Sequence, residues 1–203
     1  MKYLKYLKLF EDYHQFNKAE DEWHRSNDFT KEEEKQVRDF AKEKGFILGD
    51  IIGIGFGGVA FEIENDKSKV LKYTYDDIEA GVCGFLNNKN TTYFADIYEM
   101  FDFKGVWVIL LEKLKELDYN TINDLQIISN KIDGNKINEY NFDDITYNET
   151  LRSSLSDNQK KLYDELIAMR KEASELGFDL LDCKIDNLGL KNGHIAMFDI
   201  KER

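Results

Sequence analysis

The sequence predicts an α+β protein in which a small lobe of five β-strands is followed by a reduced, mostly helical lobe. Three observations predict this. Residues 46–114 contain short apolar runs, several with the two-residue period of half-buried strands, separated by turn residues. Residues 157–176 carry apolar side chains at helical spacing. Two further apolar runs flank the turn Lys191 to Gly193 and predict a hairpin near the C-terminus.

Composition and charge argue against several classes of function. A chain of 203 residues suits one core or two small lobes, because domains usually hold roughly 100 to 200 residues. The net charge of -12, without a long Lys/Arg cluster, argues against nucleic-acid binding. No stretch approaches the roughly 20 apolar residues of a membrane span. The opening MKYLKYLKLF interrupts its apolar residues with Lys, unlike a secretory signal.

Cysteine, histidine and proline usage bears on compartment and origin. The two cysteines have no CxxC or metal-type spacing and the histidines are scattered, which favours a reduced cytoplasm and argues against a zinc site. Proline is absent, while Asn, Lys and Ile are abundant. This suggests an AT-rich coding genome, such as that of a bacteriophage or a small bacterium. We therefore expect a cytoplasmic protein, in the host cytoplasm if a phage encodes it.

Residues 1–45 are predicted to form a helical N-terminal extension. Thr30 and Glu33 have the spacing of a capping box, in which each side chain accepts from a backbone N–H of the other's turn. An apolar face follows at helical spacing, and Gly45 is a plausible stop. An alternative for the first residues is a basic amphipathic face that touches a membrane, but packing on the body is favoured.

Residues 46–114 are predicted to form the five-stranded lobe. Two strands flank the glycines 53–58, and VLKYT forms a third. Asp76 or Asp77 caps a short helix that carries Glu79. YFADIYEMF and VWVILLE supply the last two strands.

Residues 115–203 are predicted to form the reduced lobe. Residues 115–155 are polar and weakly periodic, so we expect an irregular insert. Ser156 and Gln159 form a second capping box, and the helix ends at Gly177. One face of this helix carries an apolar stripe made of Leu162, Leu166, Met169, Ala173 and Leu176.

Glycines 53, 55 and 58 form GxGxxG, a pattern that dinucleotide-binding folds also use. A dinucleotide site needs a helix at the third glycine, whereas a strand follows here. A glycine-rich hairpin can instead lie over phosphates, since residues without Cβ let the backbone approach closely. Lys72 lies in the third predicted strand. If its side chain faces inward, the charge of its ammonium group needs a carboxylate partner. Glu79 fits best, with Asp76 or Asp77 as alternatives.

Asp182, Asn187 and Asp199 form a second polar set around the C-terminal hairpin. Asp182 and Asn187 are five residues apart in DCKIDN, and Asp199 follows the hairpin. Such residues offer an acceptor for a hydroxyl proton, an amide oxygen and a carboxylate for a metal ion. An acidic surface turn is the alternative for these residues taken alone.

Taken in order, GIGFGGVAF, VLK, Glu79, LLEKL and DCKIDN…FD resemble the signatures of protein kinases. The resemblance covers roughly residues 46–114 and 156–200. It implies that ATP and Mg²⁺ are cofactors. The implied roles in the first lobe are phosphate covering for Gly53, Gly55 and Gly58, adenine packing for Ala60, and phosphate binding for Lys72 paired with Glu79.

For the remaining motifs, the resemblance implies a gatekeeper at Leu111. Glu112 and Lys113 to Leu114 would give backbone hydrogen bonds to adenine. It also implies that Asp182 is the catalytic base and that Lys184 stabilises the moving phosphoryl group. Asn187 and Asp199 would hold Mg²⁺. Lys184, two residues after Asp182, is typical of Ser/Thr protein kinases and favours a protein substrate.

The sequence also departs from the kinase pattern. Leu180 and Leu181 stand where the family has His and Arg, and Ile200 and Lys201 replace the Phe and Gly of DFG. Only four residues follow Asp199, so we expect a minimal kinase without an activation segment. The stripe on helix 157–176 would then need another cover. We expect either residues 1–45 or a second copy of the chain, which would make a homodimer.

The sequence therefore predicts an ATP- and Mg²⁺-dependent phosphotransferase of the protein kinase-like type that acts on Ser/Thr of proteins. An inactive nucleotide-binding pseudokinase that serves as a partner-binding module is the main alternative. A kinase fold that transfers AMP, or phosphorylates a small molecule, is a third hypothesis, because fold does not fix function.

Overall fold

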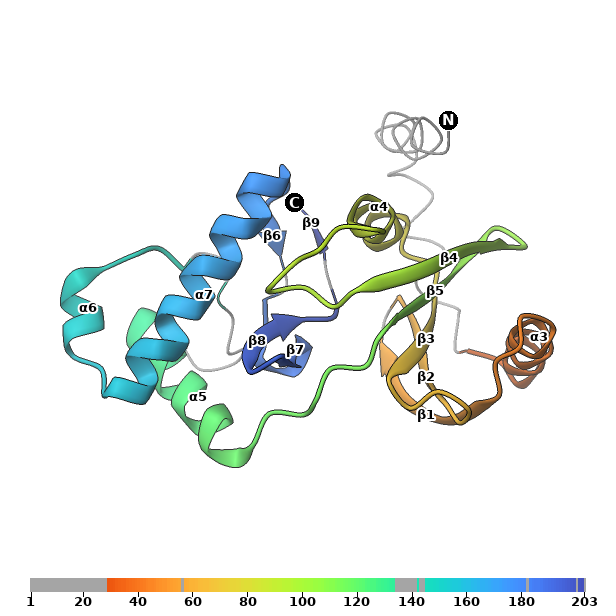
Figure 1. The fold of residues 1–203 in the computed structure, drawn as a ribbon, viewed down its shortest axis with the longest axis horizontal. Helices are drawn as coiled ribbons and strands as arrows, with labels where there is room; N and C mark the ends of the chain where they lie inside the picture. The colour runs from red at the N-terminus through yellow and green to blue at the C-terminus, as the bar shows by residue number, and fades with distance from the viewer. Residues whose placement is uncertain are drawn as a thin grey trace. The chain divides into compact units, whose positions relative to one another are not determined.

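The computed structural model describes residues 29–55, 57–133, 142, 145–181, 183–199 and 201–202. The protein is α+β, with a five-stranded antiparallel sheet and several helices (Figure 1). Its first elements are α3 (Lys31–Glu43), β1 (Leu48–Gly55), β2 (Gly58–Ile63), β3 (Lys69–Thr74), α4 (Asp77–Leu86), β4 (Ile97–Phe103) and β5 (Val106–Glu112). The later elements are α5 (Tyr119–Asp133), α6 (Glu149–Ser153), α7 (Asp157–Leu176), β6 (Leu180–Leu181), η2 (Ile185–Asn187), β7 (Leu188–Lys191), β8 (His194–Met197) and β9 (Lys201–Glu202).

These elements fall into two compact units. Unit 1 contains the chain up to Lys89 together with Asp96–Lys113, and unit 2 contains Asn90–Ala95 together with Leu114–Arg203. The units differ from the segments predicted from sequence in three respects. Helix α3 belongs to unit 1, whereas residues 90–95 and Leu114 belong to unit 2. The helices expected before residue 29 lie outside the described residues.

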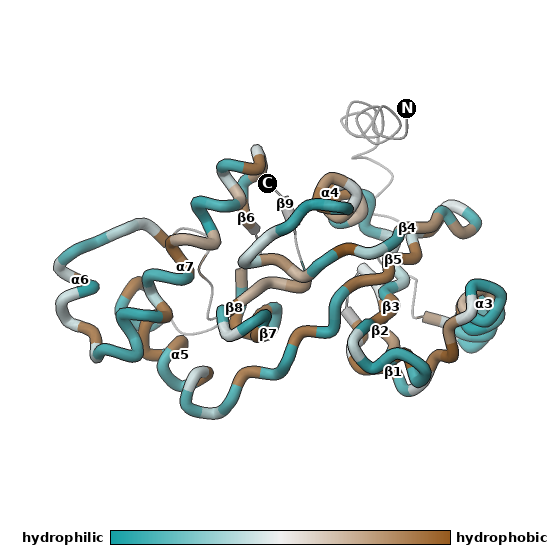
Figure 2. Tube along the Cα trace, viewed as in Figure 1, coloured by the Kyte–Doolittle hydropathy of each residue, from teal (hydrophilic) through white to brown (hydrophobic). Residues whose placement is uncertain are grey.

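Unit 1 is a sheet with a helix on each face. Its strands follow the order β1-β2-β3-β5-β4, with antiparallel neighbours. Side chains alternate between the faces of a strand. Leu71 and Tyr73 therefore share the face where Val37 and Ala41 of α3 join the apolar core, whereas Lys72 faces α4. Figure 2 colours most of α3 hydrophilic and much of α4 hydrophobic, which fits the larger buried surface of α4.

Local sequence signals explain where these helices begin. Thr30 and Glu33 form the predicted capping box of α3, and the helix ends at Lys44, followed by Gly45 with φ +86°. Asp76 caps α4 by accepting from the N–H groups of Ile78 and Glu79.

Unit 2 is built around helix α7, which contacts α5, α6, β6 and β8 (Figure 1). The predicted Ser156–Gln159 capping box opens the helix and Gly177, with φ +95°, closes it. The hairpin β7–β8 turns at Asn192 and Gly193, both with positive φ, as a tight two-residue turn requires.

The expectation of an irregular insert at 115–155 is wrong for its two helices, α5 and α6. The sequence pattern does not predict α5 because the apolar face of this helix is narrow. Among its described residues, only Leu125 and Ile128 are fully buried and apolar, in a segment rich in Asn, Asp and Thr. The propensity of this segment is weak, so packing against α7 stabilises the helix.

Part of the apolar stripe of α7 is covered within unit 2. Leu166, Met169 and Ala173 are buried where α5, α6, β6 and β8 contact the helix, whereas Leu162 and Leu176 are partly exposed. The expectation that residues 1–45 cover this stripe is wrong for α3, which packs on the sheet of unit 1. Residues 1–28 lie outside the described residues, and the homodimer stays a prediction. No helix among the described residues has the length and apolar character that crossing a bilayer requires.

Residues 90–95 are fixed within unit 2 by side chains from two elements. Glu172 of α7 accepts from the N–H groups of Thr92 and Tyr93 at 2.9 Å each. The buried Nζ of Lys191 donates to the carbonyls of Thr91 and Phe94, both at 2.9 Å. Lys191 thus satisfies buried carbonyls, and Glu172 fixes the more exposed backbone at residues 92 and 93.

Candidate functional site

The first polar set lies in unit 1, where Lys72 and Glu79 form a buried ion pair. Lys72 lies in β3 between Ala60 of β2 and Ile109 of β5. The Lys72 side chain is 15% exposed and that of Glu79 is 2% exposed. A charge this far from water needs a partner, and each of these residues gives one to the other.

Thr74 completes this group, although sequence analysis missed it. Its hydroxyl lies 2.9 Å from Oε2 of Glu79 and 3.0 Å from the carbonyl oxygen of Gly57, and Thr74 is fully buried. The same hydroxyl accepts from the N–H of Asp76 at 3.1 Å. The signal that could have found it is the strand period, since a residue two positions from Lys72 shares its face.

The structure separates Glu79 from the two alternatives considered for Lys72. Asp76 caps α4 with its side chain. Asp77 accepts from the indole N–H of Trp107 at 2.9 Å. Glu79 lies one helical turn from Asp76 and is the carboxylate that meets Lys72. The short interval between Lys72 and Glu79 is accommodated because α4 begins directly after β3.

The glycines between β1 and β2 differ in how far the fold itself requires them. A Cβ on Gly58 would lie 2.2 Å from the carbonyl oxygen of Tyr73, so the pairing of β2 with β3 demands glycine there. A Cβ on Gly53 would meet only the Cβ of Ala60, at 3.9 Å, an ordinary contact. Packing therefore accounts for Gly58 and leaves Gly53 unexplained. Gly55 pairs with Gly58 at the end of the hairpin.

The predicted adenine-binding segment begins at the end of β5. Leu111 is buried and pairs with Val70. The N–H of Glu112 donates to the carbonyl of Asp96, and the N–H of Lys113 donates to that of Ser68, both at 2.8 Å. These two donors are therefore already used within unit 1. Leu114 belongs to unit 2, where its Cβ would lie 2.6 Å from a Cβ added to Gly189.

The second polar set lies in unit 2, around the open end of hairpin β7–β8. The N–H of Phe198 donates to the carbonyl of Asn187 at 3.1 Å, which extends the hairpin by one pair and leaves Asp199 directly after it. Asn187 ends the short helix η2, and its N–H donates to the carbonyl of Lys184 at 3.0 Å. The hairpin thus brings the backbones of Asn187 and Phe198 together, one residue before Asp199.

The predicted catalytic base, Asp182, lies outside the described residues. Its neighbours are placed: Leu181 in β6 pairs with Lys201 in β9. The segments before Asp182 and after Asp199 therefore run side by side in unit 2. Among the described side chains, no group of three or more His, Cys, Asp or Glu is arranged to hold a metal ion.

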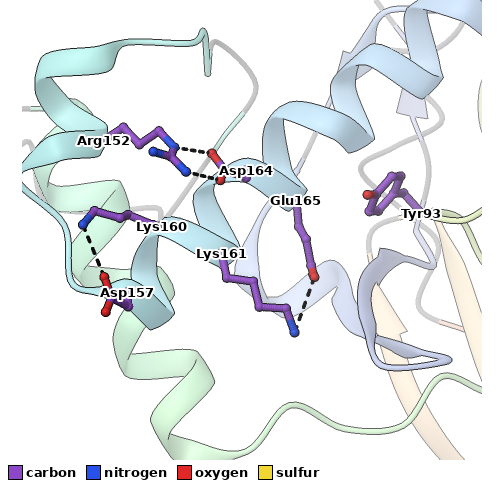
Figure 3. A pocket seen from close by; sticks show the side chains of 7 residues that line it. All are labelled: Tyr93, Arg152, Asp157, Lys160, Lys161, Asp164 and Glu165. Atoms are coloured by element: carbon purple, nitrogen blue, oxygen red, sulfur yellow. Dashed lines mark hydrogen bonds and ion pairs between the residues drawn. The ribbon is translucent and has the colours of Figure 1, made fainter.

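Unit 2 also contains an open pocket of about 430 Å³ at the N-terminal half of α7 (Figure 3). Its charged side chains are already paired with one another. The guanidinium of Arg152 donates two hydrogen bonds of 2.8 Å to the carboxylate of Asp164. These bonds hold the pKa of Asp164 below its usual value. Lys160 and Lys161 lie near carboxylates at 3.4 and 3.9 Å. None of the residues lining this pocket belongs to the predicted site.

Comparison with known proteins adds no relative: no protein-family model matches the sequence, and no curated protein matches it significantly.

Proposed function

We propose that this protein is an ATP- and Mg²⁺-dependent phosphotransferase with a protein kinase-like fold, acting on Ser/Thr of proteins. The observation that carries the proposal is the buried Lys72–Glu79 pair beside a glycine-rich hairpin. A buried ion pair contributes little net stability compared with apolar residues of similar size. Folding alone therefore does not explain why this pair is present, whereas binding of an anionic ligand would explain it.

The chemistry of the pair suits a phosphate. Lys72 is a point charge with three donors, and Glu79 fixes the position of the ammonium. In the proposed mechanism Lys72 binds the α- and β-phosphates, and Gly53 lets the hairpin backbone approach them. Ala60, opposite Lys72 in the neighbouring strand, is the small residue proposed to pack on adenine.

The segment after β5 is proposed to bind the adenine edge. Because the N–H groups of Glu112 and Lys113 are used by Asp96 and Ser68, recognition falls to the carbonyl groups and to Leu114. Leu111 is proposed as the gatekeeper. This modifies the sequence-based expectation, which did not distinguish the donors of this segment from its acceptors.

The set in unit 2 is proposed to supply the metal ligands and the catalytic groups. An amide oxygen from Asn187 and a carboxylate from Asp199 are the hard donors that Mg²⁺ takes together with substrate phosphates. When bound, Mg²⁺ would neutralise charge on the triphosphate. Asp182 is proposed to accept the hydroxyl proton of the substrate, and Lys184 to stabilise the transferred group.

Labelled ATP tests the proposal directly. The wild type is expected to bind Mg-ATP and to transfer the γ-phosphate to Ser or Thr of proteins in a host lysate. Lys72→Met and Asp199→Asn are expected to lose transfer. Lys69→Met, which removes the partly exposed ion pair of Lys69 with Asp66, lies in the same strand as Lys72 and is expected to keep it. Transfer that persists in both site variants, or a wild type that binds no nucleotide, would count against the proposal.

A nucleotide-binding module without turnover is the second candidate, and β6 favours it. Leu180 is buried in β6, where the kinase pattern has a polar residue ahead of the catalytic Asp. This candidate predicts binding of Mg-ATP with no label on any protein. The same assay therefore separates the two.

A further inference from the structure

The carbonyl of Gly57 ties the glycine-rich hairpin to the junction of β3 and α4. The backbone N–H of Tyr75 donates to this oxygen at 2.8 Å, and the hydroxyl of Thr74 lies 3.0 Å from it. A Cβ on Gly57 would lie 3.3 Å from the Cβ of Asp76, so the turn is also in close contact with the cap of α4. The position of the turn therefore follows the position of residues 74–76.

The side chain of Tyr75 reaches in another direction, to helix α3. Its hydroxyl donates to Oε1 of Glu33 at 2.5 Å, and its half-buried ring packs edge-on against Tyr73 at 5.1 Å. The other oxygen of Glu33 accepts from the N–H and hydroxyl of Thr30, at 2.7 and 2.6 Å. One carboxylate thus holds both the first turn of α3 and Tyr75.

These contacts form a continuous path from α3 to the hairpin. Glu33 holds the hydroxyl of Tyr75, and the backbone of Tyr75 holds Gly57. Neither Glu33 nor Tyr75 belongs to the set that would touch nucleotide. Burial tends to raise the pKa of Glu33, but the bonds from Thr30 and Tyr75 outweigh it and lower that pKa, so the carboxylate is charged at neutral pH.

We propose that Glu33 and Tyr75 are positioning residues through which helix α3 holds the glycine-rich hairpin in place for nucleotide. The inference rests on the proposed function and adds its regulation: nucleotide affinity depends on the docking of a helix outside the site. When Tyr75 loses Glu33, the backbone bond to Gly57 weakens and the hairpin moves more freely. Anything that undocks α3 then lowers affinity for Mg-ATP.

The test uses the full chain with Tyr75→Phe, which keeps the ring and removes the hydroxyl. Two quantities are measured in the wild type and the variant: the hydrogen-exchange rate of the backbone amide at position 75 without nucleotide, and the Kd for Mg-ATP. We expect faster exchange and a Kd raised by about tenfold, a change that corresponds to about 1.4 kcal/mol. Glu33→Gln, whose amide oxygen can still accept from Tyr75, is expected to show a smaller effect on both.

Gln36→Ala is the matched control. It removes a different bond from the same helix, that of Lys104 to Gln36 at 2.7 Å, and is expected to change neither quantity. Unchanged exchange in Tyr75→Phe overturns the inference. So does faster exchange with an unchanged Kd, or an equal effect of Gln36→Ala.

Failure of the proposed function would look different. If the wild type binds no Mg-ATP, that function is wrong, and the exchange rates alone decide whether α3 positions the hairpin. If Tyr75→Phe does not fold, Glu33→Gln supplies the comparison, with a smaller expected rise in both quantities.

Discussion

Glu79 meets Lys72 with one carboxylate oxygen and the hydroxyl of Thr74 with the other. Both carboxylate oxygens are therefore hydrogen-bonded, in a helix that only two residues separate from β3. This geometry makes Glu79 the residue through which the strand, the helix and the glycine-rich hairpin depend on one another.

Glu79→Ala is expected to lower the free energy of unfolding by about 3 to 5 kcal/mol, because it leaves the ammonium of Lys72 buried without its partner. The double variant Lys72→Met with Glu79→Leu is expected to recover most of that loss, since apolar replacement of a buried pair is often neutral. Urea unfolding followed by tryptophan fluorescence measures both. A double variant as unstable as Glu79→Ala would contradict the expectation.

The same double variant separates stability from binding. It should fold and yet bind Mg-ATP no better than Lys72→Met, because the charge proposed to bind phosphate is gone. Titration calorimetry checks this. Binding at the wild-type level would show that the pair has no part in nucleotide recognition.

Gly58→Ala is expected to lower stability, whereas Gly53→Ala is expected to weaken nucleotide binding. The first places a Cβ 2.2 Å from the carbonyl oxygen of Tyr73, so β2 and β3 must separate, at a cost of about 2 kcal/mol or more. The second meets only Ala60 at 3.9 Å and should leave stability unchanged while weakening Mg-ATP binding. Thermal unfolding and nucleotide titration of both variants test the pair. Equal stability of the two would contradict the close approach at Gly58.

Lys191→Met is expected to destabilise unit 2 by about 3 kcal/mol. The substitution keeps the apolar stem but removes the ammonium that donates to the buried carbonyl of Thr91. The carbonyl of Phe94 then keeps only the hydroxyl of Thr91 as a donor. Lys171→Met, which removes an exposed pair with Glu175 within α7, is the control and should change stability by about 0.5 kcal/mol or less. The free energy of unfolding, measured in urea for the wild type and both variants, tests this expectation. A change no larger than in the control would mean that water replaces the ammonium.

The contribution of Glu33 should depend on pH. Its pKa is lowered in the folded protein from the ordinary 4.5, so the folded state favours the charged form. The resulting stability is fully present above pH 4.5 and is lost as the pH falls through the lower folded value. The difference in unfolding free energy between the wild type and Glu33→Gln, measured from pH 3 to pH 6, should therefore shrink at low pH. A constant difference would contradict this linkage.

Local signals in the sequence were sufficient for much of the fold. Both capping boxes and the hairpin at Asn192–Gly193 depend on residues within a few positions of one another, so spacing alone predicts them. For α4, spacing narrowed the cap to Asp76 or Asp77, and the structure selects Asp76. Helix α5 could not be predicted in this way. Its two fully buried apolar residues become significant only when they pack against α7.

In the candidate site, too, local spacing predicted some features, and others depend on contacts between distant parts of the sequence. The strand period placed Lys72 on one face, but the choice of Glu79 over Asp76 required knowing that Asp76 caps α4. The link from Glu33 to Tyr75 joins residues 42 positions apart, and no spacing rule predicts it. The use of the Glu112 and Lys113 donors likewise depends on which segments lie beside β5.

The path of the chain through residues 90–95 bears on how this protein can be divided or recombined. The chain leaves unit 1 after Lys89, contributes this short stretch to unit 2 and returns at Asp96. A fragment cut after Lys113 would carry Phe94, which is fully buried in unit 2, into water, and the remaining fragment would lack it. No single cut yields two self-sufficient pieces, so in evolution and in engineering alike the two units are expected to be inherited and exchanged together.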